Sequence, residues 1–188
     1  MKFQKLTIKN IASIENAEIN FDAEPLSNSG IFLITGKTGS GKSTILDCIC
    51  LALYGITPRL KSTNIQGVTI DLDKEVSVND PRVLMRRNTS ESYVCLTFIG
   101  NDENSYQAEW SCRRANGKID GKLQDKKRCL TNLTKNFTYS KLDEIVPEIK
   151  RIIGLDFEQF LRTVMLSQGE FTRFLNSKDN EKAEILEK

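Results

Sequence analysis

The 188-residue chain has 27 basic and 25 acidic residues and no histidine, giving a formal net charge of +2, and 39% of it is hydrophobic. This balance is typical of one globular domain with a sizeable core. A membrane span is excluded, because no apolar run approaches the ~18 residues that one requires. The first nine residues alternate polar and apolar side chains and lack the apolar centre of a secretion signal, so we expect a cytoplasmic location.

The first part of the chain predicts strands at 2–9 and 17–21, joined by a turn around 13–16. A loop at 25–30 follows. The apolar run at 30–35 is typical of a buried strand, and the apolar run at 44–54 is typical of a buried helix.

The segment between those two runs has the P-loop pattern, in which four residues separate Gly36 from Gly41-Lys42-Ser43. Glycines let the backbone approach an anion, and the following helix N-terminus adds partial positive charge. Lys42 is expected to reach the β- and γ-phosphates of ATP, and the Ser43 hydroxyl to bind Mg²⁺. An ordinary glycine turn is disfavoured, because strand, loop and helix all agree. The predicted phosphate-binding residues are Gly36, Lys37, Thr38, Gly39, Ser40, Gly41, Lys42, Ser43 and Thr44.

The middle of the chain is expected to be irregular over 55–85, with a short strand near 68–72. Runs at 92–99 and 105–113 then predict a β-hairpin. Within it, four alternating side chains are expected to face the sheet core, and further strands are expected around Leu123, at 130–133 and at 137–139. The four core-facing residues are Tyr106, Ala108, Trp110 and Cys112.

Five cysteines are spread over the chain without a CxxC pair, and no histidine is present to complete a zinc site. We therefore interpret them as small core or surface residues. They are Cys48, Cys50, Cys95, Cys112 and Cys129.

The stretch 113–128 is strongly basic, with seven Lys or Arg residues against Asp120 and Asp125. It could meet a phosphate backbone. A solvated hairpin is the alternative, because charge runs usually face water. The basic residues are Arg113, Arg114, Lys118, Lys122, Lys126, Lys127 and Arg128.

The pattern becomes helical from Leu142, and a second helix is expected after Gly154. The segment 163–171 follows, with Gln168 between a helix and a new turn. Alone, Gln168 could be a surface amide that caps a helix. The four residues 166–169 also resemble the Leu-Ser-Gly-Gly signature of ABC ATPases.

Four segments together resemble the N-terminal ATPase part of the SbcC family, which is SMC-like and ABC-type. They are 6–13, 34–44, 48–54 with 57–60, and 164–171 with 174–176. The last is the most specific, because it looks like the Q-loop of that family. The resemblance implies that Gln168 contacts Mg²⁺ and the attacking water, so it is both a catalytic and a metal-binding candidate beside Lys42.

The same resemblance implies that adenine lies near Val83, Leu84 and Met85. Related chromosome-maintenance ATPases often carry a basic residue where this chain has Ala12, so a phosphate contact from that side chain is absent here. Arg86 and Arg87 lie next to the expected adenine region, and they could contact either the nucleotide or DNA.

Two motifs of a complete ABC-type ATPase are missing from the sequence. No run of four apolar residues precedes an Asp-Glu pair, as a Walker B strand requires, and no full signature is present. In the resembled family these motifs follow a long coiled coil. We therefore expect an α/β P-loop fold forming the N-terminal half of an ABC-type ATPase head over 1–176, with an antiparallel β-layer, a parallel core and a helical lobe that carries the Q-loop at 164–171. The charged segment 177–188 is expected to begin the coiled coil.

The resemblance implies an ATP-binding half-head, nearly inactive alone, that controls a DNA nuclease. Its expected partners are a C-terminal ATPase lobe of the same protein, a second head, an SbcD-type nuclease subunit and double-stranded DNA, in the cytoplasm at the nucleoid. DNA contacts could include Arg59, Lys61, Arg86 and Arg87 beside the basic stretch. A chromosome-organising or RecF-like ATPase without a nuclease, a P-loop kinase and an ABC transporter subunit are the alternatives. A kinase would phosphorylate a small acceptor without needing a second lobe.

Overall fold

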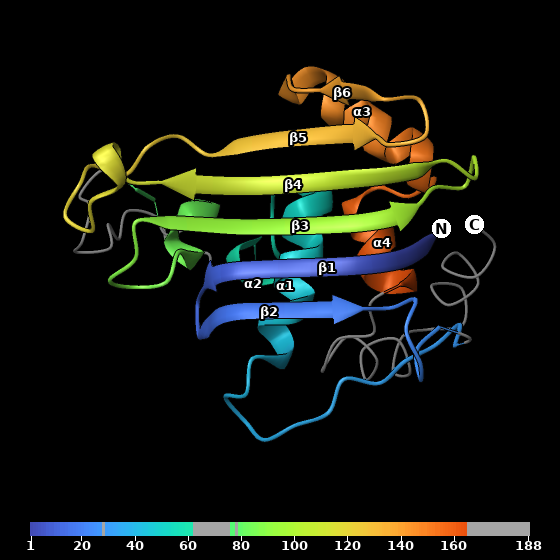
Figure 1. Cartoon of the computed structure of the whole chain (residues 1–188), viewed down its shortest axis with the longest axis horizontal. Coiled ribbons are helices and arrows are strands. Elements are labelled where there is room, and N and C mark those ends of the chain that lie inside the picture. The colour runs from blue at the N-terminus through green and yellow to red at the C-terminus, as the bar shows by residue number, and fades with distance from the viewer. Residues whose placement is uncertain (28, 62–75, 78, 165–188) are drawn as a thin grey trace.

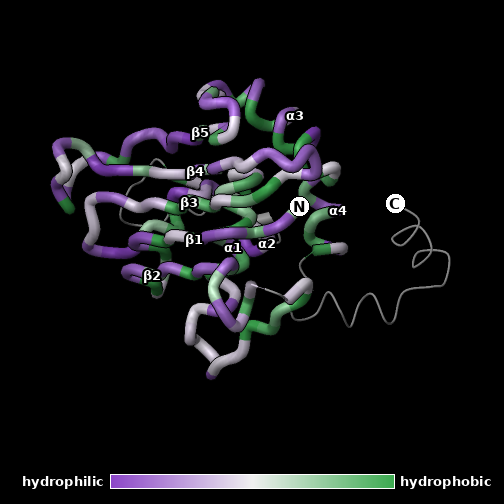
Figure 2. Tube along the Cα trace, turned by 45° about the vertical axis from the view of Figure 1, so that its right-hand side comes forward, coloured by the Kyte–Doolittle hydropathy of each residue, from purple (hydrophilic) through white to green (hydrophobic). Residues whose placement is uncertain are grey.

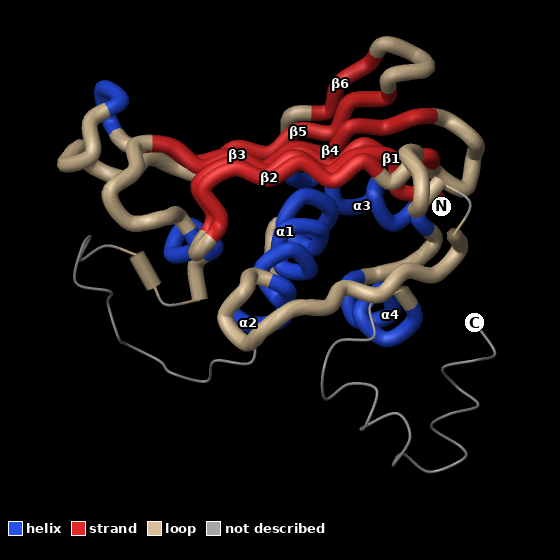
Figure 3. The backbone as a smooth tube through the Cα atoms, turned by 60° about the horizontal axis from the view of Figure 1, so that its bottom comes forward, coloured by secondary structure: helices blue, strands red, loops and turns tan. Residues whose placement is uncertain are grey.

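A computed structural model describes residues 1–27, 29–61, 76–77 and 79–164, and in these residues one antiparallel sheet lies over a layer of helices (Figures 1 and 3). The six strands are ordered β2-β1-β3-β4-β5-β6 across the sheet. The strands are β1 (Lys2–Ile11), β2 (Ile14–Asn20), β3 (Glu91–Ile99), β4 (Ser105–Arg113), β5 (Lys127–Asn132) and β6 (Phe137–Tyr139). The helices are α1 (Lys42–Tyr54), α2 (Pro58–Lys61), η1 (Pro81–Leu84), η2 (Ala115–Gly117), α3 (Leu142–Ile153) and α4 (Phe157–Thr163).

The hairpin of β3 and β4 forms the middle of the sheet, as its composition predicted. Val94 is opposite Trp110, and Leu96 is opposite Ala108. The side chains of Tyr106, Ala108, Trp110 and Cys112 are all buried, which confirms the predicted core face of β4. The expected strand at 130–133 is β5, shifted toward its N-terminus, whereas Leu123 makes only an isolated bridge to Arg114.

Helix α1 lies against the inner face of the sheet, in contact with β1, β3 and β4 (Figure 3). Its residues from Asp47 to Leu53 are all buried, because the sheet covers one side and α2 and α3 contact the helix elsewhere. Cys48 and Cys50 are among these core residues, and the five cysteines are free thiols. The predicted buried helix at 44–54 is therefore confirmed.

The apolar segment 30–35 is not a strand, contrary to the prediction. Ile31 is 93% exposed and Leu33 is 85% exposed, and Figure 2 shows this hydrophobic stretch in the loop that leads into α1, away from the sheet. A strand needs hydrogen-bonding neighbours, and a parallel strand is normally covered on both faces. Every strand pairing among the described residues is antiparallel, so they offer this segment no parallel neighbours.

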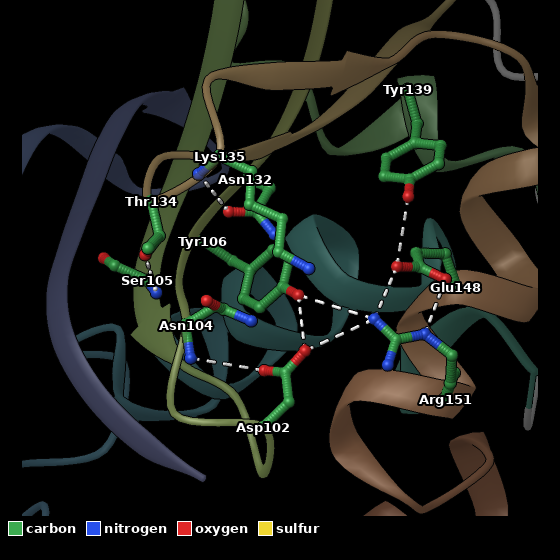
Figure 4. Close-up of polar contacts among 10 residues, drawn as sticks. All are labelled: Asp102, Asn104, Ser105, Tyr106, Asn132, Thr134, Lys135, Tyr139, Glu148 and Arg151. Atoms are coloured by element: carbon green, nitrogen blue, oxygen red, sulfur yellow. Dashed lines mark hydrogen bonds and ion pairs between the residues drawn. The ribbon is translucent and has the colours of Figure 1, made fainter.

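A polar network fastens α3 to the turn between β3 and β4 (Figure 4). The Arg151 guanidinium donates to Glu148 at 2.7 Å and to Asp102 at 3.3 Å, and the Tyr106 hydroxyl donates to Asp102 at 2.7 Å. Partial burial opposes ionisation of Asp102, but the hydrogen bonds from Tyr106 and its neighbours lower the pKa of this carboxyl to about 2. The turn also caps the helix, because Asn101 donates to the last carbonyls of α3. The predicted helices after 142 and 154 are confirmed as α3 and α4.

Candidate functional site

The loop at 36–44, where the sequence predicts a P-loop, leads directly into α1. Gly41 precedes α1 with φ +92, a left-handed conformation that favours glycine, and no side chain caps the helix. The first N–H groups of a helix have no partner within it, so those of α1 remain for a ligand. At Gly36, φ is +155, a conformation that L side chains rarely adopt, and an added Cβ would lie 2.7 Å from Ser40 Oγ.

The Lys42 side chain lies across this loop. Its ammonium group donates to the Gly36 carbonyl at 2.6 Å and to the Lys37 carbonyl at 2.8 Å. An ammonium has three N–H donors, so it can hold the loop and still donate to a phosphate oxygen. The positive charge therefore lies over the glycine backbone before any ligand arrives.

The next two residues of α1 face different surroundings. Ser43 is exposed, so its hydroxyl is accessible to a cation beside the loop. Thr44 is only 5% exposed. We therefore expect Thr44 to contact a phosphate through its backbone N–H and not through its side chain.

A recess lies beyond the turn that joins β1 and β2. It has a volume of about 420 Å³ and is lined by Ala12, Val83, Met85, Arg86 and Arg87. Of the three residues predicted near adenine, Val83 and Met85 line this recess. Leu84 does not line it but is buried, and its carbonyl accepts a hydrogen bond from the Ala12 N–H at 2.7 Å.

The turn between β1 and β2 separates the recess from the P-loop. Ile14 lies against Gly41, where an added Cβ would be 3.4 Å from Ile14 Cγ1, and Ser13 Oγ would be 3.6 Å away. On the other side, Ile11 forms an isolated bridge with Met85. The recess and the P-loop are therefore neighbours across one short turn.

The sequence did not predict one charged pair, which joins α1 to the segment that follows it. Asp47 is 4% exposed on α1, and its Oδ2 lies 2.7 Å from Arg59 Nη2. Burial raises the pKa of Asp47, whereas the Arg59 charge opposes that rise. Arg59 was grouped with possible DNA contacts, yet here it stabilises a buried carboxylate. The family resemblance at 57–60 includes Arg59 but no resembling segment includes Asp47, so the sequence did not indicate the pair.

The basic stretch 113–128 does not form one surface. Arg128 is only 9% exposed, and its Nη2 donates to the Leu53 carbonyl at the end of α1 at 2.7 Å. Burial lowers the pKa of Arg128 to about 10. The prediction that Arg128 contacts a phosphate backbone is therefore wrong, because its guanidinium lies inside the fold. Arg113, Lys118, Lys122 and Lys127 are exposed.

Several of the predicted features lie in residues that the structure does not describe. Gln168, the segment 177–188 and the short strand near 68–72 lie outside the described residues. In the described part of the chain, no group of three or more Cys, Asp or Glu side chains is arranged to hold a metal ion. Within the same residues, no helix is both long and apolar enough to cross a membrane.

The comparisons with known proteins agree on one family. A model described as AAA domain matches residues 5–188. The chain is 43% identical over its whole length to the SbcC component of the SbcCD nuclease of Pseudomonas aeruginosa and 39% identical to that of Rhodobacter capsulatus, covering 16% and 15% of those proteins. It is 29% identical, over 97% of its length and 16% of the relative, to a probable DNA double-strand break repair Rad50 ATPase of Aquifex aeolicus. The chain thus spans about a sixth of these relatives.

Proposed function

Because the chain belongs to the AAA-domain ATPase family and is similar throughout to the N-terminal segment of SbcC proteins, we propose that it is the ATP-binding half of a DNA-repair ATPase head. The observation that supports this most strongly is the P-loop. Its Lys42 ammonium lies over the Gly36 and Lys37 carbonyls, and the N-terminus of α1 has no side-chain cap.

The residues of the loop have separate tasks in this proposal. The backbone N–H groups of 36–44 surround the β- and γ-phosphates, and Lys42 neutralises their charge. Ser43 is exposed beside the loop and would hold Mg²⁺, which supplies charge neutralisation between the two phosphates. Gln168 keeps the role that the family resemblance implies, a contact to Mg²⁺ and to water.

The chain is expected to hydrolyse almost no ATP by itself. No sequence in it resembles a Walker B strand, so the carboxylates that orient water must come from elsewhere. The exposed side chains of Ile31 and Leu33 support this proposal, because they are the residues that a parallel sheet would bury. We assign that role to a C-terminal lobe of the same protein, whose strands would lie beside 30–35.

The remaining partners follow from the family. Two heads would pair around ATP, and an SbcD-type nuclease subunit would act on the ends and hairpins of double-stranded DNA. The exposed cations Arg113, Lys118 and Lys127 provide sequence-independent phosphate contacts. We place this assembly in the cytoplasm, at the nucleoid.

The test is to measure ATP turnover by the 188-residue chain, by the chain combined with a C-terminal lobe, and by that pair with double-stranded DNA. Each missing preorganised group typically changes a rate by ~10²–10³-fold, so turnover should appear only with the lobe and should rise with DNA. A pull-down of the pair with an SbcD-type nuclease tests the last partner. Rapid turnover by the chain alone, with phosphate transferred to a small acceptor, would instead identify a kinase.

A further inference from the structure

We propose that Arg86 binds the nucleoside end of the nucleotide whose phosphates the P-loop holds. This inference rests on the proposed nucleotide binding and assigns the recess beyond the P-loop to a base and its ribose. Arg86 lines that recess with Val83 and Met85. From the sequence alone, either the nucleotide or DNA could be the ligand of this arginine.

The backbone around Arg86 is fixed to the end of β1 by three contacts. The Arg86 N–H donates to the Asn10 carbonyl at 2.9 Å, Met85 bridges Ile11, and the Leu84 carbonyl accepts from Ala12. Figure 1 shows this part of the chain, coloured green, beside the turn at the end of β1. The backbone at Arg86 is therefore held in place by the end of β1.

The guanidinium of Arg86 reaches the turn that touches the P-loop. Its Nη1 donates to the Ser13 carbonyl at 2.9 Å and to the Ala12 carbonyl at 3.4 Å. Ser13 and Ile14 lie on the other side against Gly41, the residue before α1. The Arg86 guanidinium thus places a positive charge at the turn that joins β1 and β2, where the side chain of Ala12 carries no charge. The other side of the same turn contacts the proposed phosphate-binding loop.

The charge of Arg86 is only weakly neutralised. Among the described residues, its ion pair is with Glu15, which lies 4.0 Å away and is itself largely exposed. Two carbonyls hold one nitrogen of the guanidinium, and the group has five N–H donors in all, so others remain for a ligand. A planar cation suits the face of a purine and the oxygens of a ribose, because it stacks on aromatic rings and donates in a fixed geometry.

The path of a bound nucleotide follows from these positions. With phosphates on the N–H groups of 36–44, the sugar would lie over the turn at 12–14, and the base would reach the recess of about 420 Å³ on the far side of that turn. Apolar Val83 and Met85 would cover the base, while Arg86 would stack on it or donate to its sugar. The alternative is that Arg86 only holds the turn in place.

The experiment compares ATP, ADP and inorganic tripolyphosphate, each with Mg²⁺, by calorimetric titration of the intact protein. Arg86→Gln removes the charge and the planar guanidinium while leaving a polar side chain at this position. Stacking by a partly buried guanidinium accounts for about a tenfold change in affinity, so ATP and ADP should weaken by about that factor. Tripolyphosphate binding should stay unchanged, because that ligand has no nucleoside. Arg162→Gln, which changes an exposed arginine on α4, is the matched control and should alter none of the three affinities.

Two results would overturn the assignment of Arg86. One is unchanged ATP and ADP binding by Arg86→Gln. The other is an equal loss for all three ligands, which would show that Arg86 acts through the shape of the P-loop. If the unmodified protein bound neither ATP nor tripolyphosphate, the proposed nucleotide binding itself would be wrong, and that outcome is separate from both.

Discussion

Helix α1 ends in different surroundings at its two termini. At the N-terminus, Gly41 adopts a left-handed conformation, no side chain caps the helix, and residues 36–40 are exposed. At the C-terminus, Gly55 is also left-handed, but there Arg128 donates to the Leu53 carbonyl and the Tyr54 hydroxyl donates to the Leu155 carbonyl.

Under the proposed nucleotide binding, the N-terminal end of α1 serves the ligand and the C-terminal end serves the fold. Unpaired N–H groups are tolerated at an end that binds an anion, whereas buried carbonyls at the other end must be satisfied from within. Changes at the C-terminal end should therefore reduce stability. Changes at the N-terminal end should reduce binding with little effect on stability.

The largest stability loss is expected from Phe160→Ala. Phe160 is fully buried, and its ring centroid lies 5.3 Å from that of Tyr54 at the end of α1. Removing a buried phenyl ring typically costs about 3–5 kcal/mol of unfolding free energy. Urea unfolding measures the loss, with Val164→Ala as a control that should stay within about 0.5 kcal/mol, because Val164 is exposed. Equal losses in the two variants would contradict the packing described for α4.

A smaller loss is expected from Gly55→Ala. The left-handed conformation costs a non-glycine residue about 1–2 kcal/mol, and the new Cβ would also lie 2.9 Å from Arg128. Gly117→Ala is the matched control, because Gly117 has a similar φ of +64 and no atom within 4 Å of the added Cβ. We expect Gly55→Ala to lower the urea midpoint more than Gly117→Ala does. The reverse order would mean that Arg128 is not held against the end of α1.

The sequence predicted the parts of this fold that local pattern determines. The β3–β4 hairpin follows from β-rich composition and turn chemistry, α1 from its apolar run and α3 from its helical periodicity. The P-loop pattern follows from glycine spacing. The prediction of a strand at 30–35 was wrong. The apolar run is typical of a buried strand, but a strand also needs neighbouring strands to pair with, and the described residues provide none for this segment. Arg128 could not be placed either, since a basic run in sequence does not show which side of β5 each residue faces.

The site was predictable only in part for a similar reason. The loop proposed to bind phosphate is contiguous in sequence, so its residues could be named. The recess unites Ala12 with Val83 and Met85 through the pairing of Ile11 with Met85, an interaction between distant segments that periodicity does not reveal.

A still smaller effect on stability is expected from the double variant Ile31→Ser with Leu33→Ser. Both side chains are exposed, so the unfolding free energy of the chain should change by no more than about 0.5 kcal/mol. Association with a C-terminal lobe should weaken strongly in the same variant, which a pull-down would measure. Normal association would remove 30–35 from the proposed interface between the lobes.

The effect on DNA is expected to be the smallest per residue. In a salt titration of DNA affinity, Lys118→Ala and Lys127→Ala should each lower the log–log slope by about 0.9 for every phosphate that the protein no longer neutralises. Arg128→Gln should leave the slope unchanged, because Arg128 is buried. Unchanged slopes in all three variants would identify the basic stretch as a solvated surface.

The most direct test of nucleotide binding at the N-terminal end of α1 is the affinity of Lys42→Ala for ATP with Mg²⁺. Each hydrogen bond to a charged group contributes about 1.5–3 kcal/mol, so affinity should fall at least about tenfold while the urea midpoint stays close to that of the unmodified chain. Lys150→Ala, at an exposed lysine of α3, should bind ATP normally. If Lys42→Ala bound ATP as tightly as the unmodified protein, the P-loop would not be the phosphate site.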